Sequence, residues 1–275
     1  LNIDKINKKL QKQFGSAVKA ELSDNIITVK GKLSKWSDVV AACQTAATKY
    51  SEIHVVNDII CEEVQNKPMR VPKLKDNALD GRKVDVLIIG GGISGVSIAR
   101  ELSKWKLSIL LVEKEADLAL QASGRNDGEV HPGVDLSKGS KKHYYIRKGN
   151  EMYGQICKEL DVPFERVGQY VCFDKAWMKG IIYLYALWRK KHDGISDTEI
   201  ISGEELKRRE PNLREDFKFA ISNPSTGCVC PYGLTIAYAE NSALSGAEIF
   251  LNTAGTEMQV EGGAIKSGET KRGTV

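Results

Sequence analysis

The sequence of 275 residues predicts an α/β fold in which a small α+β unit precedes a larger unit built on a parallel sheet. Two observations support this prediction. In the first sixty positions, apolar residues recur at helical and at strand spacing in turn. Later, the apolar run 86–89 leads into a glycine-rich stretch, and a second apolar run, 107–112, ends at the acidic residue Glu113. Unbroken apolar runs of this kind are typical of strands buried on both faces of a parallel sheet.

The first unit is predicted to span residues 1–64 and to have the element order helix, strand, strand, helix, strand. The corresponding apolar patterns lie at 3–14, 17–22, 26–29, 39–47 and 53–60. Residues 65–82 follow with two prolines, several charges and no apolar period, so they are predicted to form a linker. The second unit then begins at Lys83.

The glycine-rich stretch after the first buried strand predicts a turn that opens a helix against a dinucleotide. Gly90 allows the sharp turn, Gly92 has no Cβ to obstruct a pyrophosphate, and Gly95 lets the helix pack close to its strand. Backbone N–H groups at the start of this helix, around Ile93 and Ser94, would then face the phosphates. The glycines alone leave flavin and nicotinamide dinucleotides as alternatives.

Glu113 stands about twenty residues beyond the first glycine, at the end of the second predicted strand. An acid at this place can accept hydrogen bonds from ribose hydroxyls, and its negative charge argues against a 2′-phosphate and therefore against NADP. Lys114 follows directly and is predicted to lie at the adenine edge or in solvent.

A glycine-rich loop follows at 121–133. It brings a hydroxyl, an amide, a guanidinium and an imidazole into one short span, as functional loops do.

Composition excludes several classes of protein. The formal charge is only +4 from 40 basic and 36 acidic residues, so no nucleic-acid partner is predicted. The six cysteines lack the spacing of a disulfide framework or a zinc site, so reduced thiols and no metal are predicted. No apolar stretch is long enough to span a bilayer. These features predict a cytoplasmic location, at most peripheral to a membrane.

From Lys83 onward the chain resembles the FAD-dependent oxidoreductases of the D-amino-acid oxidase class. Within that class it is most similar to FAD-linked glycerol-3-phosphate dehydrogenases and L-2-hydroxyglutarate oxidases. The resemblance rests on the glycine turn and on the stretches 111–117, 121–133, 147–150, 160–164, 203–206, 210–213 and 231–237. About the first sixty residues resemble a BON-type domain, through the strand 26–33, the alanine-rich helix and the stretch 55–58.

The resemblance implies a Rossmann-like FAD-binding domain with an inserted α+β substrate domain, preceded by the small α+β (BON-like) domain. The implied boundaries are 83–143 for the first FAD-binding segment, 144–231 for the substrate domain and 232–275 for the return to the FAD-binding domain. Proteins of this class continue with a further cofactor strand and a late glycine-rich loop. The resemblance therefore implies that the FAD-binding domain is incomplete and that the chain is a fragment of a longer protein.

The resemblance also assigns roles to residues outside the glycine turn. Four loop residues would lie beside the pyrophosphate and ribityl chain: Ser123, Gly124, Arg125 and Asn126. Gly255 would contact the adenine side through its backbone, where the family usually has an apolar residue. His131 is the candidate base, because an imidazole titrates near neutral pH and could take a hydroxyl proton. Arg147 or Lys148 could attract an anionic substrate.

The implied activity is oxidation of the CH–OH group of a small anion, with hydride transfer to FAD. Glycerol 3-phosphate is the leading substrate, and L-2-hydroxyglutarate or another 2-hydroxy acid is the alternative. The electron acceptor stays open between oxygen, a quinone and an iron–sulfur partner. A hypothesis of another class is a non-catalytic fragment that binds a nucleotide or docks through its first unit. An NAD-dependent dehydrogenase is a third hypothesis, since it needs the same glycines.

Overall fold

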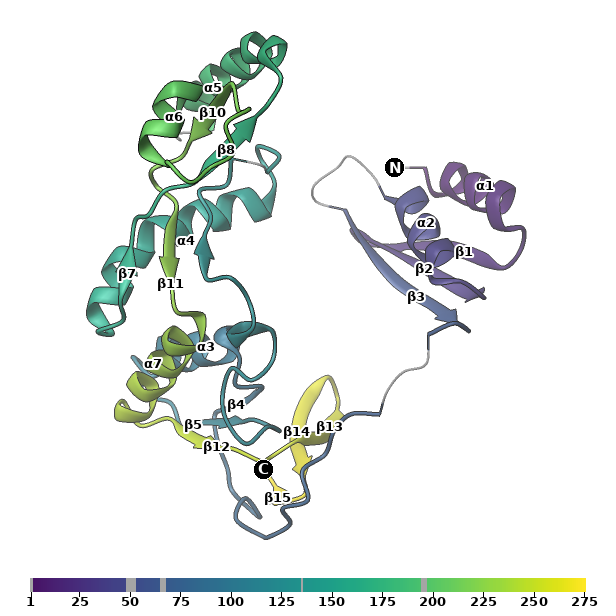
Figure 1. The fold of residues 1–275 in the computed structure, drawn as a ribbon. Helices are drawn as coiled ribbons and strands as arrows, with labels where there is room; N and C mark the ends of the chain where they lie inside the picture. Colours follow the sequence, from purple (N-terminus) through teal and green to yellow (C-terminus); the bar gives the residue numbers. More distant parts are fainter. Residues whose placement is uncertain (1, 48–52, 65–67, 135, 194–196) are drawn as a thin grey trace. The chain divides into compact units, whose positions relative to one another are not determined.

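The computed structural model describes residues 2–47, 53–64, 68–134, 136–193 and 197–275 (Figure 1). The chain divides into two compact units, Leu1–Met69 and Arg70–Val275. Each unit has its own buried apolar clusters, so each is described by itself.

The N-terminal unit has the predicted order of elements. It consists of α1 (Ile3–Phe14), β1 (Val18–Ser23), β2 (Ile26–Leu33), α2 (Trp36–Ala46) and β3 (His54–Cys61). The central strand β2 pairs antiparallel with β1 and parallel with β3. Apolar residues of both helices and of the sheet face beneath them form one core, in which Leu10, Ile27 and Val39 are almost fully buried. The element order is thus confirmed, while the BON-like relationship stays a prediction.

A three-stranded parallel sheet lies at the centre of the second unit. Its strands are β12 (Glu248–Phe250), β5 (Ile109–Val112) and β4 (Val86–Ile89), in that order. The helices α3 (Ile93–Leu102) and α7 (Pro231–Leu244) contact each other and cover one face of this sheet. Because strands buried on both faces need apolar residues throughout, all four residues of β5 are buried. The predicted Rossmann-like βαβ unit is confirmed.

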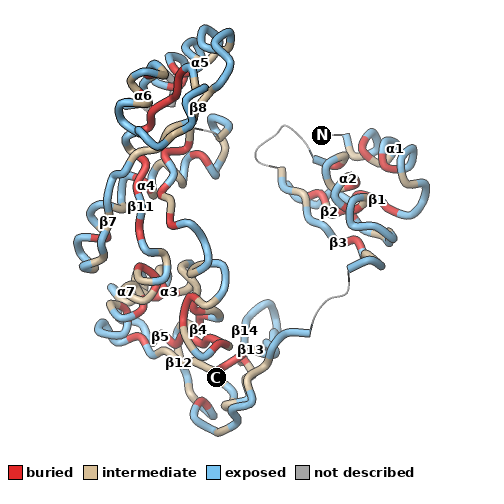
Figure 2. Tube along the Cα trace, in the orientation of Figure 1, coloured by how far each residue is buried: buried red, intermediate tan, exposed pale blue. Residues whose placement is uncertain are grey.

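The opposite face of the sheet packs against residues from both ends of the unit. The antiparallel strands β13 (Gly255–Glu261), β14 (Ala264–Thr270) and β15 (Gly273–Thr274) form a small meander beside it. Leu79 is fully buried against Leu110 and Val112 of β5. In Figure 2 buried residues are red, and red segments are visible around β4 and β5.

The segment predicted as a linker, 65–82, is in part a packed element of the second unit. Leu79 donates its backbone N–H to Arg272 at 2.8 Å, and the Arg272 guanidinium pairs with Asp76 at 3.0 Å. The charged residues around Leu79 give the segment the composition of a linker, although one apolar side chain fixes it to the sheet. Residues 65–67 lie outside the described part of the chain.

Between β5 and α7 the chain forms an inserted α+β region. One antiparallel sheet joins β6 (Glu129–Val130), β11 (Gly227–Val229) and β7 (Phe164–Glu165). Another joins β8 (Tyr170–Phe173), β10 (Phe219–Ser222) and β9 (Glu199–Ser202). The helices of this region are α4 (Lys141–Glu159), α5 (Lys179–Asp193) and α6 (Gly203–Arg209), with short 3₁₀ helices at Ala122–Gly124 and Ala176–Met178. The inserted region is confirmed, and its boundaries at 144 and 231 remain predictions.

We expect Leu79→Ala to lower the unfolding free energy of the second unit by about 3 kcal/mol, because it opens a cavity beneath β5. Leu74→Ala is the matched control, since Leu74 lies in the same segment with 43% of its surface exposed and should change stability by less than about 0.5 kcal/mol. Urea unfolding of the two variants measures the difference. Equal effects would mean that this segment is a linker after all.

Candidate functional site

The turn between β4 and α3 requires glycine at two positions for different reasons. Gly90 has φ of 110°, which other residues rarely adopt, and its N–H donates to the Val112 carbonyl at 2.8 Å. A Cβ on Gly95 would lie 2.0 Å from the Gly90 carbonyl oxygen. The first turn of α3 therefore packs directly onto the end of its strand, as the sequence predicted for Gly95.

The N-terminus of α3 faces the loop that follows β5. Ile93 donates its backbone N–H to the Ser123 hydroxyl at 2.9 Å, and a Cβ on Gly92 would lie 2.9 Å from the same oxygen. The cap residue Gly92 has no side chain to accept from the next N–H groups, and Ser94 is exposed. The structure thus brings the glycine turn and Ser123 together, with N–H groups of the first helical turn directed outward.

Glu113 is buried and fixes the turn from the neighbouring strand. Its carboxylate accepts from the Gly91 N–H at 2.5 Å and from the Glu115 N–H at 2.9 Å. The sequence predicts that this carboxylate binds a ribose. In the structure, each of its two oxygens already accepts a hydrogen bond from a backbone N–H group. The acid therefore holds the glycine turn against the end of β5, and its contact with ribose remains a prediction.

Some residues of the loop after Ser123 are held in contacts within the loop, whereas others are exposed and could contact a ligand. The Asn126 amide donates to the carbonyls of Ala122 and Ser123 at 3.0 Å and accepts from the Gly128 N–H, so it holds the loop itself. Gly124 lies against the Ala119 carbonyl, where a Cβ would approach to 2.3 Å. The Arg125 side chain is exposed and makes no ion pair within the described part of the chain. Lys114 is half-buried.

His131 follows β6 and is held through its backbone by a buried amide. Its Nδ1 lies 3.4 Å from Glu129 Oε1, and its carbonyl accepts from Asn150 Nδ2 at 3.0 Å. Asn150 is 7% exposed, donates also to the Val130 carbonyl, and accepts from the Arg166 guanidinium at 2.9 Å. Sequence reasoning missed the roles of Asn150 and Arg166, because only the fold brings α4 and the segment after β7 beside β6.

Two predicted residues have local structural partners. Arg147 lies 3.3 Å from Glu151 one helical turn later in α4, and Lys148 is exposed. Gly255 begins β13, where a Cβ would lie 3.1 Å from Ile89 Cδ1. Glycine there lets β13 approach the end of β4, and the adenine contact remains a prediction.

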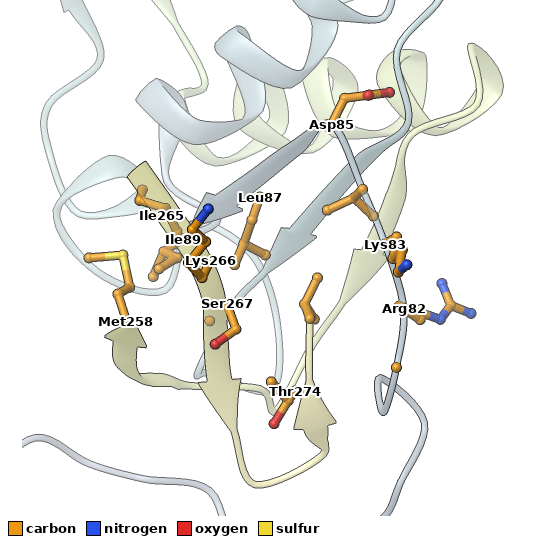
Figure 3. Close-up of a pocket in the computed structure, with 14 residues that line it drawn as sticks. Arg82, Lys83, Asp85, Leu87, Ile89, Met258, Ile265, Lys266, Ser267 and Thr274 are labelled. Atoms are coloured by element: carbon orange, nitrogen blue, oxygen red, sulfur yellow. The ribbon is translucent and has the colours of Figure 1, made fainter. Parts of the chain in front are cut away.

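Of two cavities beside the sheet that bear on the site, the smaller one is associated with the predicted residues. A cavity of about 100 Å³ is lined by Ile93, Ser123, Asn126 and Glu129. The larger, of about 550 Å³, runs between β4 and the meander, where Leu87 and Ile265 face it (Figure 3). None of the predicted site residues lines the larger cavity.

A family model described as "DAO: FAD dependent oxidoreductase" matches residues 85–275. The chain belongs to this family. The match identifies FAD as the cofactor and removes the nicotinamide alternative that the glycine turn left open. It covers the parallel sheet, the inserted α+β region and the meander, and excludes the N-terminal unit.

Similar proteins in this family include dehydrogenases of two hydroxy compounds. A glycerol 3-phosphate dehydrogenase from Caloramator mitchellensis is 40% identical over 169 residues, which are 61% of this chain and 35% of that protein. A mitochondrial L-2-hydroxyglutarate dehydrogenase from Nematostella vectensis is 32% identical over 192 residues, or 69% of this chain and 41% of that protein. The chain thus spans well under half the length of these relatives.

Solved structures of flavin oxidases share the fold of the second unit. Glycine oxidase from Bacillus cereus matches with a TM-score of 0.63 and 28% identity, over 70% of this chain and 53% of that one. An L-alpha-glycerophosphate oxidase from Mycoplasma pneumoniae, with FAD bound, matches with a TM-score of 0.59 and 23% identity, over 69% and 49% of the two chains. The second likeness concerns the fold alone.

The turn geometry fits the diphosphate end of this family's cofactor. The missing Cβ of Gly92 keeps the start of α3 open, and the N–H groups of Ser94 and Gly95 have no acceptor within the described part of the chain. Such N–H groups and the positive end of the helix dipole suit an anion.

A double-mutant cycle tests the contact between Gly92 and Ser123. Gly92→Ala should lower the unfolding free energy by about 1–2 kcal/mol, because the new Cβ would press on the Ser123 hydroxyl. In a Ser123→Ala background the same change should cost about 1 kcal/mol less. Gly149→Ala in α4 is the control: no atom lies within 4 Å of its Cβ position, so it should be neutral or stabilising. Additive effects would contradict the contact.

Proposed function

We propose that the full-length protein oxidises the secondary alcohol of a small anion and transfers the hydride to FAD. Glycerol 3-phosphate is the leading candidate substrate. The main supporting observation is that the glycine turn, Glu113 and Ser123 meet at the start of α3. The chain that carries them belongs to a family of FAD-dependent oxidoreductases. The similarity to a glycerol 3-phosphate dehydrogenase supports the choice of substrate.

The residues around the turn would hold the adenosine and diphosphate part of FAD. N–H groups of Ser94 and Gly95 would donate to the diphosphate, and the exposed Arg125 guanidinium would add a positive charge beside it. The remaining acceptor capacity of Glu113 would serve the ribose, since a carboxylate can accept more than two hydrogen bonds. The isoalloxazine ring, when bound, supplies the redox chemistry by accepting hydride.

His131 would take the proton of the substrate hydroxyl. Glu129 Oε1 lies 3.4 Å from its Nδ1, so the carboxylate can orient the ring and leave Nε2 for the substrate. Asn150 and Arg166 would fix the backbone at this place. In support, Glu129 also lines the cavity that contains Ile93 and Ser123, which links this segment to the start of α3.

L-2-hydroxyglutarate is the second candidate substrate, supported by the similarity to L-2-hydroxyglutarate dehydrogenases. Both substrates carry a hydroxyl beside an anionic group, so the pocket chemistry alone does not separate them. Assays of the purified full-length protein with FAD and a dye acceptor would do so. We expect a higher kcat/KM for glycerol 3-phosphate, and faster turnover of L-2-hydroxyglutarate would reverse the assignment.

We further propose that the N-terminal unit is a docking module. Among its described residues, the side chains best suited to catalysis are the exposed His54 imidazole and the thiols of Cys43 and Cys61. The described residues contain no group of three or more His, Cys, Asp or Glu that could hold a metal ion.

Replacement of His131 tests its proposed role as a base. His131→Gln should lower kcat on the order of 100-fold or more with FAD stoichiometry unchanged, and the acidic limb of the pH–rate profile should disappear. His54→Gln in the N-terminal unit is the control and should keep the wild-type profile. A variant with wild-type kcat and pH profile would exclude proton transfer by His131.

A further inference from the structure

The outward face of α5 is apolar and aromatic, although this helix lies at the surface. Trp177 in the preceding 3₁₀ turn, Ile181 and Leu184 are 70%, 62% and 68% exposed, and Trp188 is 44% exposed. Their spacing of four, three and four residues places them on one face of a helix. Tyr183 and Leu187 widen the patch, with 52% and 46% of their surfaces exposed. We call these six residues the α5 patch; exposed turns of α5 are visible in Figure 2.

The inward face of α5 is held by polar contacts. Arg189 is 3% exposed and donates to the carbonyls of Gly133 and Leu136, and the Tyr185 hydroxyl donates to the Val134 carbonyl at 2.9 Å. A surface helix of a globular protein normally has its apolar stripe inside and its polar residues outside. The buried face of α5 carries Ala186 and Arg189, so the exposed apolar residues form a second apolar face. The Arg189 contacts keep this second face outward, because turning the helix would break them.

Basic residues flank the α5 patch, and between positions 174 and 193 they outnumber the two acidic residues, Asp174 and Asp193. Four exposed lysines flank it at the two ends of the helix: Lys175, Lys179, Lys190 and Lys191. Lys138 lies 5.8 Å above the Trp188 ring. The patch therefore combines exposed aromatic rings with a positive rim.

We propose that the α5 patch docks the protein on an anionic lipid bilayer surface. Tryptophan and tyrosine partition to the interface between headgroups and acyl chains, and lysines beside them attract anionic headgroups. Among the described residues no helix is long and apolar enough to cross a membrane, so α5 would lie in the plane of the interface. The positive rim favours a lipid surface over a second copy of the chain, whose α5 patch would carry the same charges.

Vesicle binding by the full-length protein tests this proposal. We expect co-sedimentation with vesicles of phosphatidylcholine and phosphatidylglycerol, and much weaker binding to phosphatidylcholine alone. Trp177→Ser combined with Leu184→Ser should weaken binding on the order of 100-fold. Lys190→Gln combined with Lys191→Gln should weaken it about 30-fold, as expected for two lysines near a charged surface.

Matched variants at other surface positions distinguish vesicle binding through the α5 patch from nonspecific binding by exposed aromatic or basic residues. Trp105 lies between α3 and β5 and is 68% exposed, close to the 70% of Trp177. Trp105→Ser should therefore bind like the wild type. Lys8→Gln with Lys9→Gln in α1 is the control for charge. Failure of the wild type to bind, or wild-type binding by the patch variants, would overturn the proposal. Loss of a dimer in sedimentation velocity without vesicle binding would assign the patch to a second copy instead.

Discussion

The close approach of three backbone segments at the ends of β4 and β5 determines the site. Gly95 touches the Gly90 carbonyl where any side chain would collide, and Glu113 draws the Gly91 N–H toward the end of β5. The start of α3 and Ser123 are placed by these contacts. A change in any of them would move the N–H groups at the start of α3, so packing alone already requires glycine at these positions.

Sequence patterns predicted the local parts of this arrangement well. The strand, the glycine turn and the helix 93–102 follow from neighbouring residues, since apolar runs and glycines act over a few positions. The order of elements in the N-terminal unit followed from the same reasoning. The family resemblance then distinguished flavin from nicotinamide, which the turn alone could not do.

The contacts that sequence patterns did not reveal are long-range. Leu79 looked like part of a charged linker, yet it packs beneath β5, and Asp76 pairs with Arg272 almost two hundred residues later. Glu113 was assigned to a ribose, and its bonds to backbone N–H groups depend on how the turn folds back. Asn150 donates to three carbonyls from two distant segments, those of Val130 and His131 and that of Ser225. Such partners become visible only when the chain is folded.

Reduction of the flavin by substrate tests the central claim most directly. Full-length protein should be isolated with flavin absorbance or acquire it when FAD is added. Without oxygen or dye, glycerol 3-phosphate should then bleach that absorbance in a single turnover. Protein that takes up no FAD would contradict the site described at the start of α3. Protein that holds FAD, yet is reduced by neither glycerol 3-phosphate nor L-2-hydroxyglutarate, would contradict the proposed reaction and leave the cofactor site intact.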